Sequence, residues 1–183
     1  MKKFAGCFKF GCFAFLVLAI AIGWSTWQVS QREKHQEEAK VTDAQFSKYT
    51  GAKGPPAEAT DDSKARYRKG RLLPINVQAG MVDEIYYTLP ADFRATKADD
   101  VGTVAWLQWV SQTKGHYDNG GAAVKTDCDI VVYDVARKAI VAREHIEGDE
   151  PPSVVSHERG SKIGWGKLPT EKVVGFLKSL PVR

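Results

Sequence analysis

Four titratable residues in the C-terminal half of the chain are the best candidates for a site that does chemistry. His116 and Asp118 share one loop, whereas Asp127 and His145 lie in two neighbouring strand-like segments. Imidazole and carboxylate groups ligate metals and transfer protons, so these residues would suit a small hydrolase or a metal-dependent enzyme. Asp127 and Asp129 alternate onto one side of their strand, and His145 lies on the next.

The spacing of these residues lacks the established metal-binding patterns. The sequence contains no HxxxH, CxxC or calcium-loop spacing. Exposed cross-strand ion pairs with Lys125 and Arg143 explain the same side chains. We therefore expect no metal, no cofactor and no catalytic residue. The pattern favours a non-catalytic protein and keeps the enzyme as an alternative.

Two other segments come close to catalytic motifs without their chemistry. Cys128 alternates in phase with Ile130 and Val132, which predicts a buried, inert thiol. Residues 160–167 (GSKIGWGK) place five residues between the first glycine and the Gly-Lys pair. A phosphate-binding P-loop needs four, followed by a hydroxyl residue, so this segment is expected to be a loop.

Trp165 is the candidate for binding without catalysis. It lies in that Gly-rich segment, where a large aromatic is either packed onto the body or presented to a partner. Trp106 and Trp109 instead lie in a strand-like run, where aromatic side chains usually belong to the core. A second alternative is therefore a glycan or peptide binder that acts through the Trp165 loop.

The excess of positive charge lies at the N-terminus. The chain has 183 residues with 26 Lys and Arg against 22 Asp and Glu, and a net charge of +4. Lys2, Lys3 and Lys9 supply three of these charges within a stretch that has no acidic residue, so the body is nearly neutral. A basic run at residues 64–71 follows Asp61 and Asp62 and is expected to be solvated. We therefore expect no nucleic-acid partner.

Residues 10–27 (FGCFAFLVLAIAIGWSTW) carry no charged side chain. As an α-helix this run rises ~27 Å at ~1.5 Å per residue, close to the ~30 Å hydrocarbon thickness of a bilayer. The lysines before it place the N-terminus in the cytoplasm, because basic residues stay on that side. The expected anchor residues in the lipid bilayer are Phe10, Phe13, Phe15, Leu16, Leu18, Trp24 and Trp27.

This run defines the expected location and organisation. We expect a single-pass signal anchor in the plasma (inner) membrane with a periplasmic or extracellular C-terminal domain. Cleavage after the small residues near Ala21 would instead give a secreted protein. The expected segments are a cytoplasmic basic tail (1–9), a transmembrane signal anchor (10–27), a stalk and linker (28–69) and an extracytoplasmic domain (70–183).

The body alternates strand-like runs with turn residues. We expect strands at 72–77, 103–113, 122–133 and 138–146, and an amphipathic helix at 169–180. Short turns between the last three strands predict an antiparallel meander. The predicted class is α+β: an N-terminal transmembrane helix and stalk, then a small antiparallel (meander) sheet packed with short helices and a C-terminal helix.

Short motifs lie along most of residues 70–183: LPADFRA at 89–95, DVGTV at 100–104, GHYDNG at 115–120, Cys128, Pro151-Pro152, residues 167–170 and LKSLP at 177–181. These motifs are similar to those of an uncharacterised family of exported bacterial envelope proteins. The resemblance implies a cell-envelope setting and no known activity. The expected anchor and the lack of a catalytic constellation lead us to expect a non-catalytic binding or assembly module, with an envelope protein or a glycan as its possible partner.

Overall fold

The computed structural model describes residues 41–118, 120–153 and 163–183. The chain divides into two compact units, Met1–Thr42 and Asp43–Arg183, and the second contains the sheet. The predicted anchor at 10–27 and the first part of the predicted stalk lie outside the described residues. Within those residues, no helix has both the length and the apolar character needed to cross a membrane.

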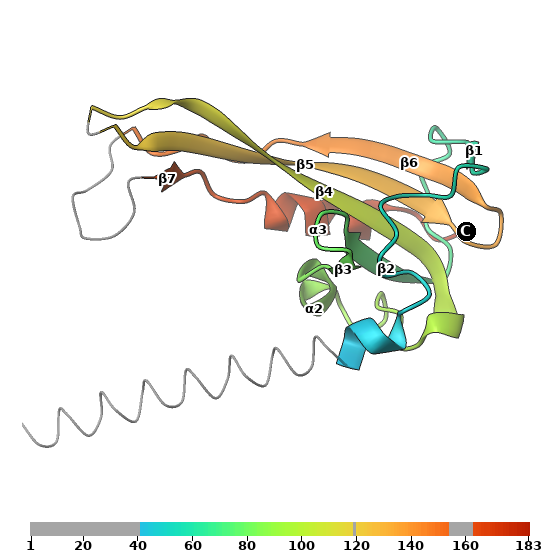
Figure 1. The fold of residues 1–183 in the computed structure, drawn as a ribbon. Helices are drawn as coiled ribbons and strands as arrows, with labels where there is room; N and C mark the ends of the chain where they lie inside the picture. The colour runs from blue at the N-terminus through green and yellow to red at the C-terminus, as the bar shows by residue number, and fades with distance from the viewer. Residues whose placement is uncertain (1–40, 119, 154–162) are drawn as a thin grey trace, which may run out of the picture. The chain divides into compact units, whose positions relative to one another are not determined.

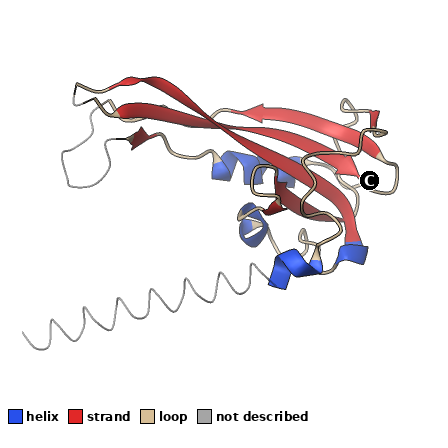
Figure 2. Ribbon diagram, in the orientation of Figure 1, coloured by secondary structure: helices blue, strands red, loops and turns tan. Residues whose placement is uncertain are grey.

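The second unit is built on one sheet with strand order β1-β6-β5-β4-β2-β3, and β7 pairs with β5 (Figure 1). The strands are β1 (Thr60–Asp61), β2 (Arg71–Asn76), β3 (Met81–Val82), β4 (Val101–His116), β5 (Ala122–Asp134), β6 (Ala139–Ile146) and β7 (Gly164–Trp165). The described helical segments are residues 41–45, α2 (Ile85–Thr88), a single 3₁₀ turn (Ala98–Asp100) and α3 (Thr170–Ser179) (Figure 2).

The predicted fold class is wrong, because the sheet is mixed and the described helices are few. β4, β5 and β6 pair antiparallel in series. However, β2 pairs parallel with β4, β1 with β6, and β7 with β5. Turn residues report only hairpins between neighbouring segments, whereas each parallel pair joins segments separated by other structure. The local pattern therefore missed the three parallel pairings.

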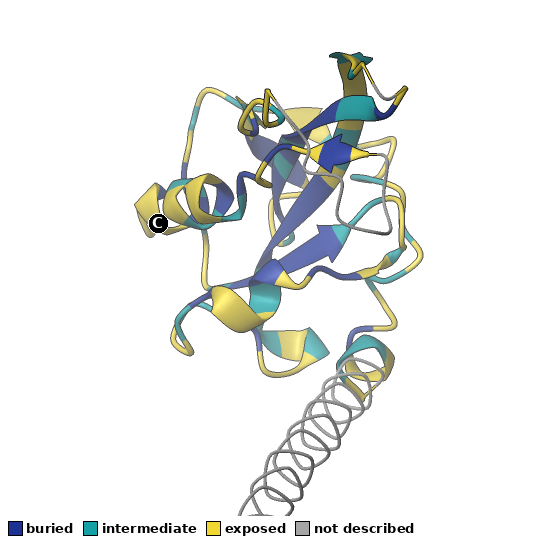
Figure 3. Ribbon diagram, turned by 90° about the vertical axis from the view of Figure 1, so that its left-hand side faces the viewer, coloured by how far each residue is buried: buried dark blue, intermediate teal, exposed yellow. Residues whose placement is uncertain are grey.

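Both faces of the sheet are buried against separate hydrophobic clusters (Figure 3). On the helix face, Leu107 and Ile130 pack with Leu177 of α3. On the opposite face, Trp106 and Tyr133 pack with residues of β2 and of the segment before β1. Residues 104–107 alternate between the two clusters, and the predicted strand at 103–113 and helix at 169–180 are confirmed. Each fully buried Leu or Ile contributes ~1.5–3 kcal/mol of transfer free energy.

The segment at 43–69, which the sequence assigns to stalk and linker, belongs to the compact unit. Phe46 is fully buried in the second cluster, and Asp43 accepts a hydrogen bond from the backbone N–H of Val82 at 2.8 Å. Tyr67 is buried in the first cluster, and β1 pairs with β6. Isolated apolar residues thus hold a segment that is polar on average.

Beyond the ends of β2 and β6, the pair β4–β5 continues as an arm formed by residues 109–118 and 120–127 (Figure 1). At its base, the Gln78 side-chain amide donates to the carbonyl of Trp109 at 2.6 Å and accepts from its N–H at 3.3 Å. Along the other edge of the arm, β7 pairs with Ala123 and Val124. The arm therefore carries β7 away from the apolar centre of the sheet.

Gly166, next to β7, allows one of the closest backbone approaches in the unit. Its N–H donates to the carbonyl of Val124 at 2.8 Å, and a Cβ there would lie 2.0 Å from the carbonyl oxygen of Asp149. We expect Gly166→Ala to lower the free energy of unfolding by ~1–3 kcal/mol, because backbone must move to remove the clash. Urea denaturation followed by circular dichroism measures this change.

Gly175 on α3 provides the matched control. It is exposed, and a Cβ there would meet nothing within 4 Å. We expect Gly175→Ala to raise the free energy of unfolding by ~0.5–1 kcal/mol, because alanine favours a helix interior. Equal stability of the two variants would contradict the close packing at Gly166.

Candidate functional site

The structure separates the predicted titratable residues into two groups. His116 pairs with Ala122 near the tip of the arm, whereas His145 pairs with Asp129. Ala122 and Asp129 are seven residues apart on β5, or ~23 Å at ~3.3 Å per residue. His116 and its loop neighbour Asp118 therefore cannot share a metal or a substrate atom with the groups around His145.

Asp127, Asp129 and His145 do come together, as the alternation along the strands predicts. Nδ1 of His145 lies 2.6 Å from Oδ1 of Asp129, and its Nε2 lies 4.0 Å from Oδ2 of Asp127. The hydrogen bond to Asp129 is the main cause that raises the pKa of His145. Across the described ranges, no group of three His, Cys, Asp or Glu residues could hold a metal ion.

Lys125 is the charged residue at the centre of this region. Its side chain is almost fully buried, and its Nζ lies 2.7 Å from Glu147, 3.2 Å from Glu150 and 3.8 Å from Asp127. These contacts, chiefly the hydrogen bond to Glu147, raise the pKa of Lys125. The ammonium group therefore stays protonated and is unsuited to act as a base or a nucleophile.

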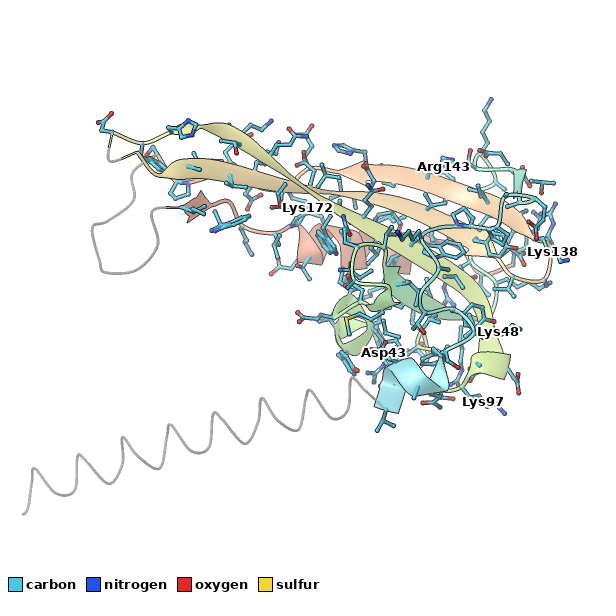
Figure 4. All side chains as sticks on the ribbon, viewed as in Figure 1. Asp43, Lys48, Lys97, Lys138, Arg143 and Lys172 are labelled. Atoms are coloured by element: carbon cyan, nitrogen blue, oxygen red, sulfur yellow. The ribbon has the colours of Figure 1, made fainter. Side chains whose placement is uncertain are left out.

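The same carboxylates fasten the chain that follows β6. Asp127 is buried and accepts a hydrogen bond from the N–H of Gly148 at 2.9 Å. Lys172 of α3, labelled in Figure 4, binds the carboxylate of Asp149 at 3.1 Å and the carbonyl of Glu147 at 3.0 Å. Residues 147–150 are thus held between β5 and α3. The charged residues of this cluster therefore have a structural role, because they fix residues 147–150 to β5 and α3.

Cys128 confirms the prediction of a buried thiol. It is fully buried, and burial raises the pKa of the thiol to about 12. A thiolate is the reactive form of cysteine, and almost none is present near neutral pH. Cys128 therefore cannot serve as the nucleophile that an acyl-transfer enzyme would need.

The tryptophans of the body take different places. Trp106 is buried, and Trp109 packs against the helix-face cluster while its Nε1 donates to Asp83 at 2.9 Å. Trp165 instead remains 55% exposed, although its backbone forms β7 and pairs in register with Val124. Pairing on a strand fixes the side of the strand from which the indole extends. The sequence predicts only a loop at this position and gives no sign of β7.

Two more apolar side chains are exposed beside Trp165. Ile163 is 40% and Leu168 is 50% exposed, and the two flanking glycines, Gly164 and Gly166, are buried. We call residues 163–168 the Trp165 segment. Lys167 and Glu171 form an exposed ion pair at 3.3 Å next to it. Exposed apolar side chains next to charged residues are typical of a contact surface.

A cavity that the sequence does not indicate lies at the opposite end of the sheet. It is lined by Tyr67, Lys69, Asp134, Arg137 and Arg183. Of the basic run at 64–71, only Lys69 contributes a basic side chain to this lining. Asp134 lies at the end of β5, Arg137 in the β5–β6 turn and Arg183 after α3, so their proximity depends on the fold.

Comparison with known proteins identifies no relative of the chain. No protein-family model matches it, and neither a curated protein nor a solved structure does. The class that the fold and the site define is therefore a mixed-sheet domain with a structural charge cluster and an exposed aromatic segment. Its function has to be argued from that geometry.

The effect of Asp129 on the pKa of His145 can be tested by pH titration. Because the hydrogen bond to Asp129 raises the pKa of His145, we expect Asp129→Asn to lower that pKa towards the ~6.5 of an unperturbed histidine. The stabilisation from this pair is present below the pKa of the unfolded state and is lost as the pH rises through the folded pKa. NMR titration of the imidazole C–H signals measures the shift.

Asp118→Asn at the tip of the arm is the control for this titration. It removes a carboxylate of the same kind at a distance from His145, so we expect the His145 titration curve to be unchanged. An unchanged curve in Asp129→Asn would show that the hydrogen bond does not hold the imidazolium.

Proposed function

We propose that the protein is a membrane-anchored, non-catalytic binding module of the cell envelope whose Trp165 segment contacts a protein partner. The observation that carries the proposal is the exposed indole of Trp165 on a backbone that pairs with β5. Tryptophan is enriched among the residues that dominate binding energy at protein interfaces. A fixed backbone lowers the entropy lost when such a residue binds.

The neighbours of Trp165 favour a protein partner over a sugar. Ile163 and Leu168 add exposed aliphatic surface, which a complementary apolar surface would bury. The ion pair between Lys167 and Glu171 lies at the margin, where charged groups set specificity more than affinity. An exposed indole alone would also suit a glycan, so the experiment below distinguishes the two partners.

The charged residues of the body support a non-catalytic function. Lys125 and Asp127 are buried and bonded to groups of the protein, and they hold residues 147–150. Acid–base catalysis needs a titratable group with access to a substrate. The separation of His116 from His145 also counts against the hydrolase or metal-enzyme alternative.

The membrane anchor in this proposal rests on the uncharged run at 10–27 and the lysines before it. It places the compact unit outside the cytoplasm. Secretion after signal-peptide cleavage is the alternative, and it keeps the same side of the membrane for the body.

A photo-crosslinking experiment tests the partner surface. A photoreactive phenylalanine derivative replaces Trp165 in the full chain in living cells, and a second strain carries it at Met81, which is 41% exposed elsewhere on the sheet. We expect a discrete protein adduct from position 165 only. Adding Leu168→Ser should reduce the adduct several-fold, because a neighbouring apolar contact is lost.

The other outcomes of this experiment are also informative. An adduct whose added mass is removed by a glycosidase, and which contains no second polypeptide, would support the glycan alternative and contradict the protein partner. The same adducts from positions 165 and 81 would indicate random contact and overturn the proposal.

Topology is tested in spheroplasts. We expect added protease to digest the body and the chain to stay with the membrane during an alkaline wash, because the anchor is retained. Intact-mass measurement gives the start of the chain, and a mature chain that begins just after Ala21 would favour secretion. Protection of the body from external protease would contradict the proposed orientation.

A further inference from the structure

The cavity at the β5–β6 end of the sheet combines three basic side chains in one small space. Its volume is about 180 Å³, and Lys69, Arg137 and Arg183 line it together with Tyr67 and Asp134. We propose that this cavity binds a phosphate group, either as a free phosphate ester or as the headgroup of an anionic phospholipid. The inference is independent of the proposed function of the Trp165 segment.

Asp134, the buried acid of the cavity, already accepts hydrogen bonds from donors of the protein. Asp134 is fully buried, and its Oδ2 accepts a hydrogen bond from the hydroxyl of Tyr67 at 2.8 Å. Its Oδ1 accepts the backbone N–H groups of Ala136 at 2.9 Å and Arg137 at 3.0 Å. These bonds satisfy the carboxylate. It therefore shapes the turn that carries Arg137.

A hydrogen bond to Tyr67 holds the side chain of Arg137 at the cavity. Its Nη1 donates to the hydroxyl oxygen of Tyr67 at 2.9 Å, and its carboxylate partner, the partly exposed Asp62, lies at 3.5 Å. The hydrogen bond to Tyr67 is the main cause that raises the pKa of Arg137. A guanidinium group has five N–H donors in a planar fork, so most of its donors are left for a ligand.

The other two basic residues are held by their backbones. The N–H and the carbonyl of Lys69 both bond to the hydroxyl of the buried Thr103, each at 2.8 Å. The N–H of Arg183 donates to the carbonyl of Arg68 at 3.0 Å, and its guanidinium lies 5.1 Å from the centre of the Tyr67 ring. The backbone of each residue is therefore fixed before a ligand arrives.

Neither of these two residues has an acidic partner. Among the residues that the structure describes, no carboxylate lies within ion-pair distance of Lys69 or Arg183. The three cations outnumber the one carboxylate of the lining, Asp134, so their mutual repulsion is only partly offset, and a further anion between them relieves it. Charge-assisted hydrogen bonds then form at each contact.

The arrangement of the donors favours phosphate among anions. An ammonium and two guanidinium groups approach from three separate segments, and a tetrahedral oxyanion offers acceptor oxygens in several directions. A planar carboxylate would pair with one guanidinium group and leave the other guanidinium and the ammonium group without an acceptor. The volume suits the phosphate group and leaves a larger ester outside, in solvent or in a lipid surface.

The cavity is distant from the Trp165 segment. Val124, the partner of Trp165, and Asp134 are ten residues apart on β5, or ~33 Å at ~3.3 Å per residue. Changes at one place therefore leave the other intact, which keeps the two proposals separable by experiment.

Isothermal titration calorimetry of the full chain in maltoside micelles tests the proposal, with glycerol phosphate as the probe. We expect saturable binding that weakens roughly 10-fold or more in Lys69→Gln and in Arg183→Gln, because each loses a charge-assisted contact. Both side chains are exposed, so both variants should fold. Arg143, which Figure 4 labels, is an exposed arginine that pairs with Asp61 at 3.3 Å. The control variant Arg143→Gln should bind glycerol phosphate as tightly as the parent chain does.

A second titration separates the two sources of phosphate. Micelles doped with phosphatidic acid should abolish the glycerol phosphate signal, with the same dependence on Lys69 and Arg183, if the ligand is a lipid headgroup. Unchanged binding in doped micelles assigns the cavity to a free phosphate ester. The proposal is overturned if neither probe binds saturably, or if both variants bind as tightly as Arg143→Gln.

Discussion

The antiparallel pairing of β4 with β5 is the constraint on which the rest of the structure depends. Its register runs from Thr103 opposite Asp134 to His116 opposite Ala122. β2 attaches to β4, and both β6 and β7 attach to β5, so each of these strands is placed by this pair. The two hydrophobic clusters lie on opposite faces of the same pair. The cavity and the Trp165 segment are held apart because they lie near opposite ends of it.

β5 changes character along its length. From Ile130 to Tyr133 it alternates between two apolar clusters, whereas Lys125 and Asp127 bury charge on the arm. Buried charges are costly unless each has partners, and here the partners are supplied by residues 147–150. The arm thus gains its order from polar contacts, because it extends beyond the reach of the core.

The sequence predicts the elements better than their arrangement. Strands around β2, β4, β5 and β6 and the helix α3 follow from local periodicity, and the same alternation predicts that Asp127 and His145 meet. Parallel partners leave no turn between them for the sequence to reveal. Phe46 and Tyr67 are single apolar residues in polar surroundings, so the share of residues 43–69 in the core was missed. The cavity was missed because it needs Lys69 and Arg183, which are distant in sequence, to meet.

The bond between the Gln78 amide and the backbone of Trp109 also bears on aggregation. Past the end of β2, no described strand pairs with the outer edge of β4, and an open edge of this kind can template a strand from another molecule. At the base of this edge, the Gln78 side chain bonds to the backbone of Trp109. Near the tip, the register shift between Thr113 and Gly115 and the charge of Lys114 interrupt the regular edge. Little regular edge is left between these two interruptions. We therefore expect the arm to resist edge-to-edge polymerisation in spite of its length.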